Sequence, residues 1–232
     1  MQKVIFLISY LPIKLYGKYA KPKDSLTFLF SLHKRMLTLI SDRASDYEGG
    51  VHPKHRLMQY HKFFTDRIKP KERVLDIGSG RAYLAYQMAQ AGAVVTGIEL
   101  SARNIEISQK LYKHEGLTFI HGDAWKDLPH EKFDTVVMSN VLEHIDERVK
   151  FIRMVEQWVS ASRWLIRVPC FDRDWTVALA KELGLDSRLD ETHFTEFTDE
   201  SFRREMHEAG MDITHFEKQW GEIWAEVKPS KS

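Results

Sequence analysis

The residues best suited to binding a small ligand follow two short apolar runs. Residues 73–77 have the composition of a buried strand, and Gly78, Ser79 and Gly80 follow directly. Glycines after a buried strand let a ligand approach the backbone, where a side chain would block it. The next apolar run ends at Glu99, whose carboxylate suits the two hydroxyls of a ribose. The two turns together predict a ligand that contains a ribose.

The residues around this turn indicate which class of ligand it takes. A dinucleotide fingerprint requires Gly-x-Gly-x-x-Gly, and position 83 is Tyr83. The negative carboxylate of Asp76 would repel a pyrophosphate, but it can accept a hydrogen bond from a cationic amino group. The pattern therefore favours S-adenosylmethionine, with a nicotinamide-dependent oxidoreductase as the alternative.

The elements that must position these residues alternate along the chain. Strands are expected at 73–77, 93–98, 117–120, 133–138 and 164–168, with helices at 81–90, 101–114 and 146–159 between them. Helices at 175–183 and 198–209 and strands at 211–217 and 223–227 follow. Short strands separated by helices predict βαβ units, so we expect an α/β fold: a seven-stranded, mostly parallel sheet with helices on both faces. Ligands bind such sheets at the carboxyl ends of the strands.

The first part of the chain has a different composition. Residues 1–46 are basic and apolar, with Pro12 and Pro22 as expected breaks. Asp24 or Ser25 is the expected cap of a helix that extends to residue 40. A flexible junction at residues 49–50 and a second helix between Pro53 and Pro70 complete this segment.

Composition excludes several classes of protein. Lys and Arg number 34 against 33 Asp and Glu, a net charge of +1, which argues against binding nucleic acid through a general positive field. Cys170 is the single cysteine, so neither an intrachain disulfide nor a cysteine-based zinc cluster can form. The apolar run at residues 4–13 has about half the length of a spanning helix, and no cleavage site follows it. We therefore expect a cytoplasmic protein.

Residues 1–23 nevertheless combine this apolar run with five lysines and no acid. Such a segment can lie at the inner face of a membrane, with its lysines on anionic head groups. The alternative is a helix that packs over the cofactor site or against a second subunit, as in a homodimer.

Four motifs in order resemble the class I S-adenosylmethionine-dependent methyltransferases, in particular those of type 11. They are the run 74–80, Glu99, the sequence Gly-Asp-Ala at 122–124, and Asn-Val-Leu-Glu-His-Ile at 140–145. The resemblance covers about residues 70–227 and implies a Rossmann-like methyltransferase domain at 70–232, with residues 1–69 as a helical extension or lid. Ala82 departs from the pattern, because the family usually has a third glycine there.

The resemblance also implies how the cofactor is bound. In the family, the glycine turn passes under the methionine moiety. The acid after the second strand binds the ribose, and its apolar neighbour packs on the adenine. The residues after the third strand form hydrogen bonds with the adenine ring. The corresponding residues here are Asp76, Gly78, Ser79, Gly80, Glu99, Leu100, Asp123, Ala124 and, beside the methionine, Asn140.

Two histidines are candidates for the base that removes a proton from the acceptor. His144 follows the fourth strand, where this family holds the transferring methyl group. Its neutral imidazole can accept a proton near neutral pH. His193 lies in a loop that resembles the acceptor side of these enzymes. The Glu-His turn is similar to that of quinone-pathway O-methyltransferases, where it resembles a metal-binding site. The pattern of those enzymes has a further acid, and this chain has Asn140 in its place. We therefore expect no metal.

A third group follows the glycine junction. His52, His55, Arg56 and Tyr60 could bind the acceptor, because histidine and arginine cations suit an anionic group. The alternative is an ordinary solvated helix start.

We expect transfer of a methyl group, with S-adenosylhomocysteine as the product, to a hydroxyl of a small-molecule, glycan or lipid-linked acceptor. This region and the His193 loop are similar to methyltransferases of bacterial glycan and cell-surface pathways. A non-catalytic S-adenosylmethionine-binding protein is the further alternative.

Overall fold

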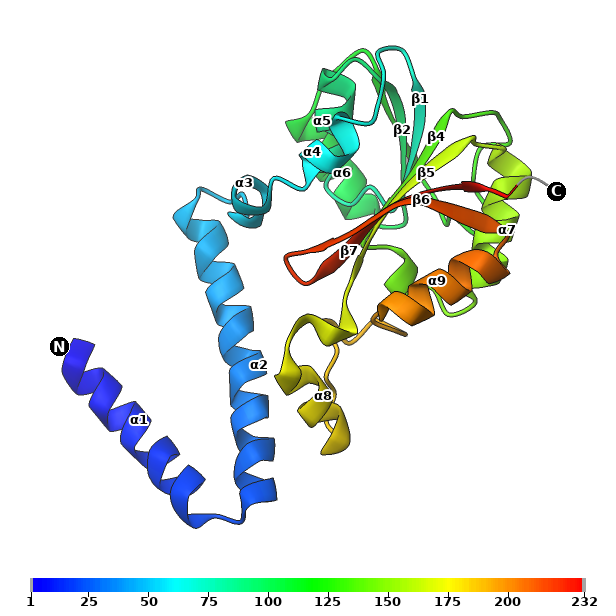
Figure 1. The fold of residues 1–232 in the computed structure, drawn as a ribbon. Helices are drawn as coiled ribbons and strands as arrows, with labels where there is room; N and C mark the ends of the chain where they lie inside the picture. The colour runs from blue at the N-terminus through cyan, green and yellow to red at the C-terminus, as the bar shows by residue number, and fades with distance from the viewer. Residues whose placement is uncertain (1, 231–232) are drawn as a thin grey trace. The chain divides into compact units, whose positions relative to one another are not determined.

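The chain folds into two compact units in a computed structural model that describes residues 2–230, with side chains from Tyr10 onward (Figure 1). Unit 1 comprises Met1–Leu57 and Trp175–Ser187, and unit 2 comprises Met58–Asp174 and Arg188–Ser232. The division therefore follows Leu57, whereas the sequence placed it after residue 69. Unit 1 also takes up a segment from the second half of the chain, which composition did not indicate.

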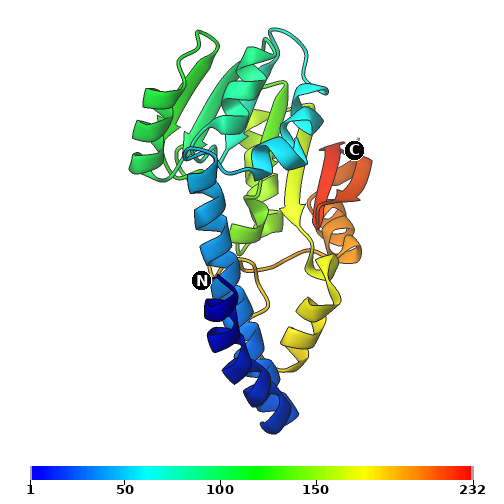
Figure 2. The same ribbon diagram turned by 90° about the vertical axis from the view of Figure 1, so that its left-hand side faces the viewer.

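Unit 2 contains a seven-stranded sheet in the order β3-β2-β1-β4-β5-β7-β6. Strands β1 to β5 pair in parallel, and β7 pairs antiparallel with both β5 and β6. Figure 2 shows β3 (green) at one edge and β6 (orange) toward the other. The expected mostly parallel α/β sheet is confirmed. The strands are β1 Arg73–Ile77, β2 Val94–Glu99, β3 Leu117–His121, β4 Thr135–Ser139, β5 Arg163–Pro169, β6 Met211–Gln219 and β7 Glu222–Pro229.

Helices cover both faces of this sheet, because successive side chains of each strand point to opposite sides. On β4, Val136 and Met138 enter one apolar core with α7 and α9, while Val137 enters the other with α4 and α5. Figure 1 shows α4 to α6 on one side and α7 and α9 on the other. The unit 2 helices are α4 His61–Thr65, α5 Tyr83–Gln90, α6 Ala102–Leu111, α7 Arg148–Val159 and α9 Asp199–Glu208, with 3-10 turns η1 Leu142–His144 and η2 Phe171–Arg173.

The order of the strands reverses direction between β1 and β4. Strand β1 leads to β2 on one side, while β4 lies on its other side, with Ile77 opposite Met138. The turns after β1 and β4 therefore meet at the same edge of the sheet, where ligands of such folds bind. These two turns carry the glycines and His144.

Unit 1 is built from helices. Helix α1 (Gln2–Tyr19) and α2 (Pro22–Tyr47) meet in a turn, with the Tyr16 and Phe28 rings 5.1 Å apart, and Lys34 pairs with Asp186 at 3.1 Å. Helix α8 (Trp175–Glu182) completes the unit, and α3 (Lys54–Met58) lies at its boundary.

Three local expectations for the first part of the chain are wrong. Helix α1 continues through Pro12, although an interior proline lacks the N–H that would donate to the preceding turn. Helix α2 starts at Pro22, after Lys21, without a side-chain cap. The helix predicted after residue 53 is divided into α3 and α4, since Gln59 takes a left-handed φ of 48°. Within residues 2–230, we find no helix that combines the length and apolar character needed to cross a membrane.

Candidate active site

The turn after β1 has a backbone that only glycine tolerates at its first position. Gly78 has a φ of +69°, and a Cβ there would lie 2.7 Å from Cγ2 of Val141, in the turn after β4. Ala82, where the sequence departs from the family pattern, is buried with a φ of +60°. This left-handed conformation costs a non-glycine residue about 1–2 kcal/mol, which explains the usual glycine. Nothing lies within 4 Å of a Cβ built on Gly80.

Glu99 ties this turn to the end of β2. Its Oε2 accepts a hydrogen bond from the backbone N–H of Gly80 at 3.0 Å, and its Oε1 accepts from the N–H of Ser101 at 2.9 Å and from Nδ2 of Asn104 at 3.2 Å. A carboxylate offers about four acceptor positions, so one remains for a ligand hydroxyl. Glu99 therefore shapes the turn in addition to its predicted contact with ribose.

Asp76 is an acid buried beneath the same turn. Its side chain is 2% exposed, and Oδ2 has no hydrogen-bond partner among the described residues. Burial, and then the negative charge of Glu99, raises the pKa of Asp76 to about 8. The hydroxyl of Ser79 also lacks a partner within residues 2–230. A cationic amino group would supply the missing partner and favour the ionised carboxylate, and this contact of Asp76 with a ligand remains a prediction.

The predicted adenine side is formed by the turn after β3 and by Leu100. Asp123 closes that turn, because its Oδ1 accepts a hydrogen bond from the N–H of Trp125 at 3.0 Å. Its Oδ2 lies 3.6 Å from Nζ of Lys126. Leu100 is 71% exposed, so its apolar surface is open to a ring stacked on it. The adenine contacts of Asp123, Ala124 and Leu100 remain predictions.

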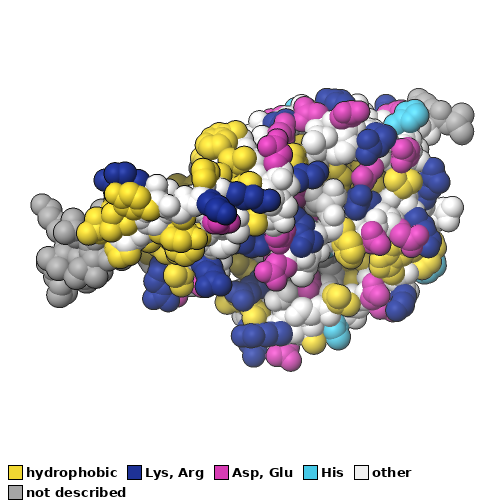
Figure 3. All heavy atoms as spheres, turned by 90° about the horizontal axis from the view of Figure 1, so that it is seen from below, with side chains coloured by type: hydrophobic (Ala, Val, Ile, Leu, Met, Phe, Trp, Pro, Cys, Tyr) yellow, Lys and Arg dark blue, Asp and Glu magenta, His cyan; other side chains and the backbone are white. Residues whose placement is uncertain are grey.

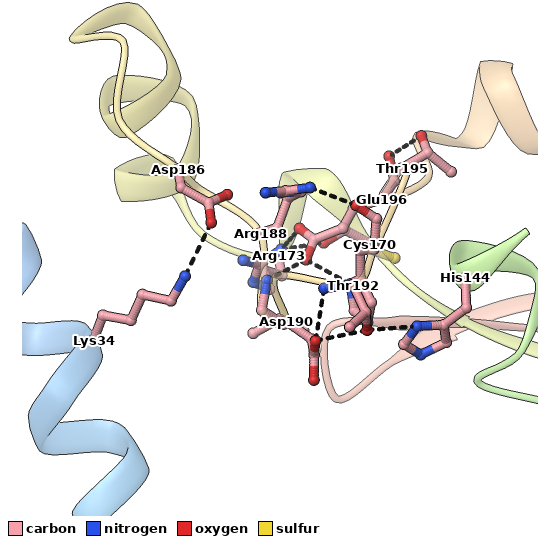
Figure 4. Close-up of polar contacts among 12 residues, drawn as sticks. Lys34, His144, Cys170, Arg173, Asp186, Arg188, Asp190, Thr192, Thr195 and Glu196 are labelled. Carbon is pink, nitrogen blue, oxygen red and sulfur yellow. Dashed lines mark hydrogen bonds and ion pairs between the residues drawn. The ribbon is translucent and has the colours of Figure 1, made fainter. Parts of the chain in front are cut away.

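His144 takes part in a chain of hydrogen bonds with a loop of unit 2 (Figure 4). Nδ1 of His144 lies 2.9 Å from Oγ1 of Thr192, and Oγ1 of Thr192 lies 2.7 Å from Oδ1 of Asp190. The ionised carboxylate of Asp190 can only accept, so the Thr192 hydroxyl donates its proton there. Nδ1 of His144 must then donate to Thr192, which leaves a free lone pair on Nε2. This is the tautomer that a general base requires.

His193 lies beside His144 but in a different environment. The two ring centroids are 4.6 Å apart in an edge-to-face arrangement, and His193 is 6% exposed. Nδ1 of His193 lies 3.3 Å from Oε1 of Glu196. The other carboxylate oxygen of Glu196 forms an ion pair with Arg173. Arg188 donates to the carbonyl of His193 at 2.7 Å. These buried contacts hold the loop that carries Thr192.

Glu143 is completely buried on the other side of the same turn. Neither of its carboxylate oxygens has a hydrogen-bond partner among the described residues. Burial is the main cause that raises the pKa of Glu143 to about 8. One ligand atom from each of Glu143, His144 and His193 lies within 4.8 Å of the others, so this group could hold a metal ion, although the sequence led us to expect none.

Arg167 is a site residue that the sequence analysis missed. Its side chain is buried at the end of β5, where Nε donates to Oδ1 of Asn140 at 3.2 Å and Cζ lies 3.8 Å over the Tyr60 ring. Asn140 takes a φ of 59° at the turn after β4. The signal was available, since Arg167 is the charged residue within the apolar run 164–168. Asn140 is thus held in place from β5.

The predicted acceptor group is divided between the two units. Tyr60 belongs to unit 2, whereas His52, His55 and Arg56 belong to unit 1. Within unit 1, Nε2 of His52 lies 3.1 Å from Oγ of Ser41, and Arg56 pairs with Glu48. A role for these residues on an acceptor remains a prediction.

The chain matches a known protein family over most of its length. The profile described as "Methyltransferase domain" covers residues 50–216. The chain belongs to this methyltransferase family. Among curated relatives, the ubiquinone biosynthesis O-methyltransferase of Paracidovorax citrulli is 28% identical over 54% of this chain and 56% of the relative. The protein of the same name from Haemophilus ducreyi is 36% identical over 35% of this chain and 38% of the relative. The chain spans about half the length of the curated relatives it matches, or less.

Solved structures show the same fold. The magnesium protoporphyrin IX methyltransferase of Synechocystis PCC 6803 with bound S-adenosylhomocysteine has a TM-score of 0.60 at 20% identity, covering 74% of this chain and 83% of that one. An S-adenosylmethionine-dependent methyltransferase from Mesorhizobium loti has a TM-score of 0.57 at 15% identity, covering 73% and 97%. The expected Rossmann-like fold, the methyltransferase family and S-adenosylmethionine as its cofactor are confirmed. The nicotinamide-dependent alternative is wrong.

Glu143 is expected to make the stability of the methyltransferase fall as pH rises. Its pKa is raised from 4.5 to about 8, so the folded state binds the proton more tightly than the unfolded state in this range. Raising the pH through this interval therefore destabilises the fold. Glu143→Gln removes the ionisation, and should increase the free energy of unfolding at the upper end of the interval by about 4 kcal/mol, with no gain at the lower end.

Urea unfolding at several pH values measures this difference. Glu106→Gln, at an exposed position of α6, is the matched control and should leave the pH dependence unchanged. If Glu143→Gln unfolds with the same pH dependence as the unaltered protein, Glu143 is not held neutral by burial.

Proposed function

We propose that this methyltransferase transfers the methyl group of S-adenosylmethionine to a hydroxyl, and that Nε2 of His144 takes the proton of that hydroxyl. The hydrogen-bonded chain Asp190–Thr192–His144 carries this proposal. The curated relatives, named as O-methyltransferases, support oxygen as the methylated atom. We further propose that the acceptor is a small molecule, a glycan or a lipid-linked compound.

The bound sulfonium supplies the electrophilic methyl group, and the protein must align the acceptor and remove its proton. The turns after β1 and β4 adjoin, so residues predicted to hold the methionine moiety, Asp76 and Asn140, lie on the same edge of the sheet as His144. When Nε2 takes a proton, the imidazolium keeps its bond to Thr192, and Asp190 stabilises the new positive charge through that hydroxyl. Glu143, which is neutral below about pH 8, adds little negative charge there.

His193 is the second candidate for the base. Its nearly complete burial and its contact with Glu196 favour a positioning role: the loop 188–197 is held so that Thr192 meets His144. His193 also affects His144 electrostatically. Burial and then the neighbouring His193 lower the pKa of His144, which keeps the base neutral to a lower pH than usual.

The test begins with methyl-labelled S-adenosylmethionine and a panel of phenolic, sugar and lipid-linked hydroxyl compounds. With the best acceptor, Thr192→Val should lower kcat by about 10-fold or more, because the orienting hydrogen bond is lost, while Thr192→Ser should retain activity. Asp190→Asn should shift the acid limb of the pH profile to lower pH, since Asp190 raises the pKa of His144. If Thr192→Val and Thr192→Ser behave alike, the hydrogen-bonded chain has no role in proton removal.

A further inference from the structure

The first two helices of unit 1 expose a large share of apolar surface. More than half of the exposed large hydrophobic side chains of the described residues lie on α1 and α2. Met36, Leu39 and Ile40 are 47%, 57% and 58% exposed. An extended apolar surface of this kind marks an interaction site, because single exposed apolar residues are ordinary but large groups of them are not.

These side chains follow the helical repeat. On α2, Leu29, Met36 and Ile40 are separated by seven and four residues, so they lie on one side of the helix, with Leu39 next to Met36. On α1, Leu11, Leu15 and Tyr19 recur every fourth residue and form a second apolar stripe. Each of these residues is exposed. Both helices are therefore amphipathic, with apolar sides that unit 1 itself leaves open.

Basic side chains border the apolar stripes. Lys14 and Lys18 each precede a residue of the α1 stripe by one position, so they form the neighbouring stripe on that helix. Figure 3 shows Lys and Arg side chains beside hydrophobic ones over this part of the chain. Between residues 10 and 40 there is one acid, Asp24. The bases of this segment are Lys14, Lys18, Lys21, Lys23, Lys34 and Arg35.

We propose that the apolar sides of α1 and α2 lie on an anionic lipid surface, with their lysines on the head groups. A bilayer interface offers both an apolar layer and negative charge, which is what this surface complements. A second copy of the chain would instead bring two basic segments together, which their repulsion disfavours. Tyr10, Tyr16 and Tyr19, all exposed, are of the residue type that is enriched at such interfaces. This inference does not depend on the proposed function; it would bring the enzyme to a lipid-linked acceptor.

Flotation of the full chain with vesicles tests this inference. We expect binding to vesicles of phosphatidylcholine mixed with phosphatidylglycerol, weakened by salt, and little binding to phosphatidylcholine alone. Lys14→Gln/Lys18→Gln/Lys21→Gln should reduce partitioning by about 10²-fold, since each lysine near an anionic surface contributes about fivefold. The control Lys69→Gln/Lys110→Gln/Lys113→Gln, at exposed positions of unit 2, should bind as the unaltered chain does.

A second pair of variants tests the contribution of the apolar side chains to vesicle binding. Leu39→Ser/Ile40→Ser should lower binding to anionic vesicles by about tenfold or more, whereas Val94→Ser/Leu111→Ser, at exposed positions of unit 2, should not. Affinity for S-adenosylhomocysteine reports on unit 2 separately and should be the same in all variants. Absence of vesicle binding under every condition would overturn the inference. So would a dimer in lipid-free solution that Leu39→Ser/Ile40→Ser dissociates, because a second copy would then cover this surface.

Discussion

Replacing His144 by alanine is expected to lower turnover by about 10²–10⁴-fold while leaving the affinity for S-adenosylhomocysteine nearly unchanged. The reason is that Nε2 of His144 is the predicted acceptor of the hydroxyl proton, whereas the predicted cofactor contacts come from the turns after β1, β2 and β3 and from Asn140. Kinetics with methyl-labelled cofactor and calorimetric binding measure the two quantities separately. His130→Ala, at an exposed position, is a matched control.

A decrease of less than about threefold in turnover would mean that His144 is a structural residue and not the base, since general bases contribute far more. His193 would then be the next candidate, and His193→Ala would have to produce the larger loss. We expect His193→Ala to act instead on His144: it removes a neighbour that lowers the pKa of His144, so the acid limb of the pH profile should move to higher pH.

Glu99→Ala is expected to weaken cofactor binding strongly. A charged hydrogen bond to a ribose hydroxyl contributes about 1.5–3 kcal/mol, so losing one bond lowers the affinity by about 10–150-fold. The structure adds a second reason, because Glu99 also accepts from the N–H of Gly80 and from Ser101 and Asn104. The turn that faces the ligand therefore loses its support in the same variant.

Glu99→Gln separates these two contributions. Glutamine keeps the size and one carbonyl acceptor, so it should retain more of the turn geometry and more of the affinity than alanine. Calorimetry with S-adenosylhomocysteine gives both affinities, and thermal unfolding shows whether unit 2 remains folded. Unchanged affinity in both variants, with the fold intact, would remove Glu99 from the cofactor site.

The fold of unit 2 could be predicted because its strands carry local signals. Apolar runs bounded by glycine or acidic residues placed β1 to β5 within about two residues of their observed limits. The motifs after β1, β2, β3 and β4 indicated the family. The break at Gln59 could not be predicted, since a left-handed glutamine is imposed by its surroundings rather than by its own preference. The same holds for residues 175–187, which join unit 1 through contacts distant in sequence.

The candidate site was predictable only in part, for a similar reason. His144 and His193 could be selected by residue type and position, but their meeting at 4.6 Å depends on the fold of the loop 188–197. That loop is held by the ion pair of Arg173 with Glu196, residues 23 positions apart. Thr192 had no signal of its own, because threonine is common in polar loops. The role proposed for it rests on the distances to His144 and Asp190 alone.

The most direct test of the central claim is to identify the atom that receives the methyl group. The purified chain is incubated with ¹³C-methyl-labelled S-adenosylmethionine and a cell extract that contains water-soluble and lipid-linked acceptors, and the products are analysed by NMR. We predict a labelled methoxy group that forms with the unaltered chain and is strongly diminished with His144→Ala. Label found only on nitrogen, carbon or sulfur, or a methoxy product formed equally well without His144, would contradict it.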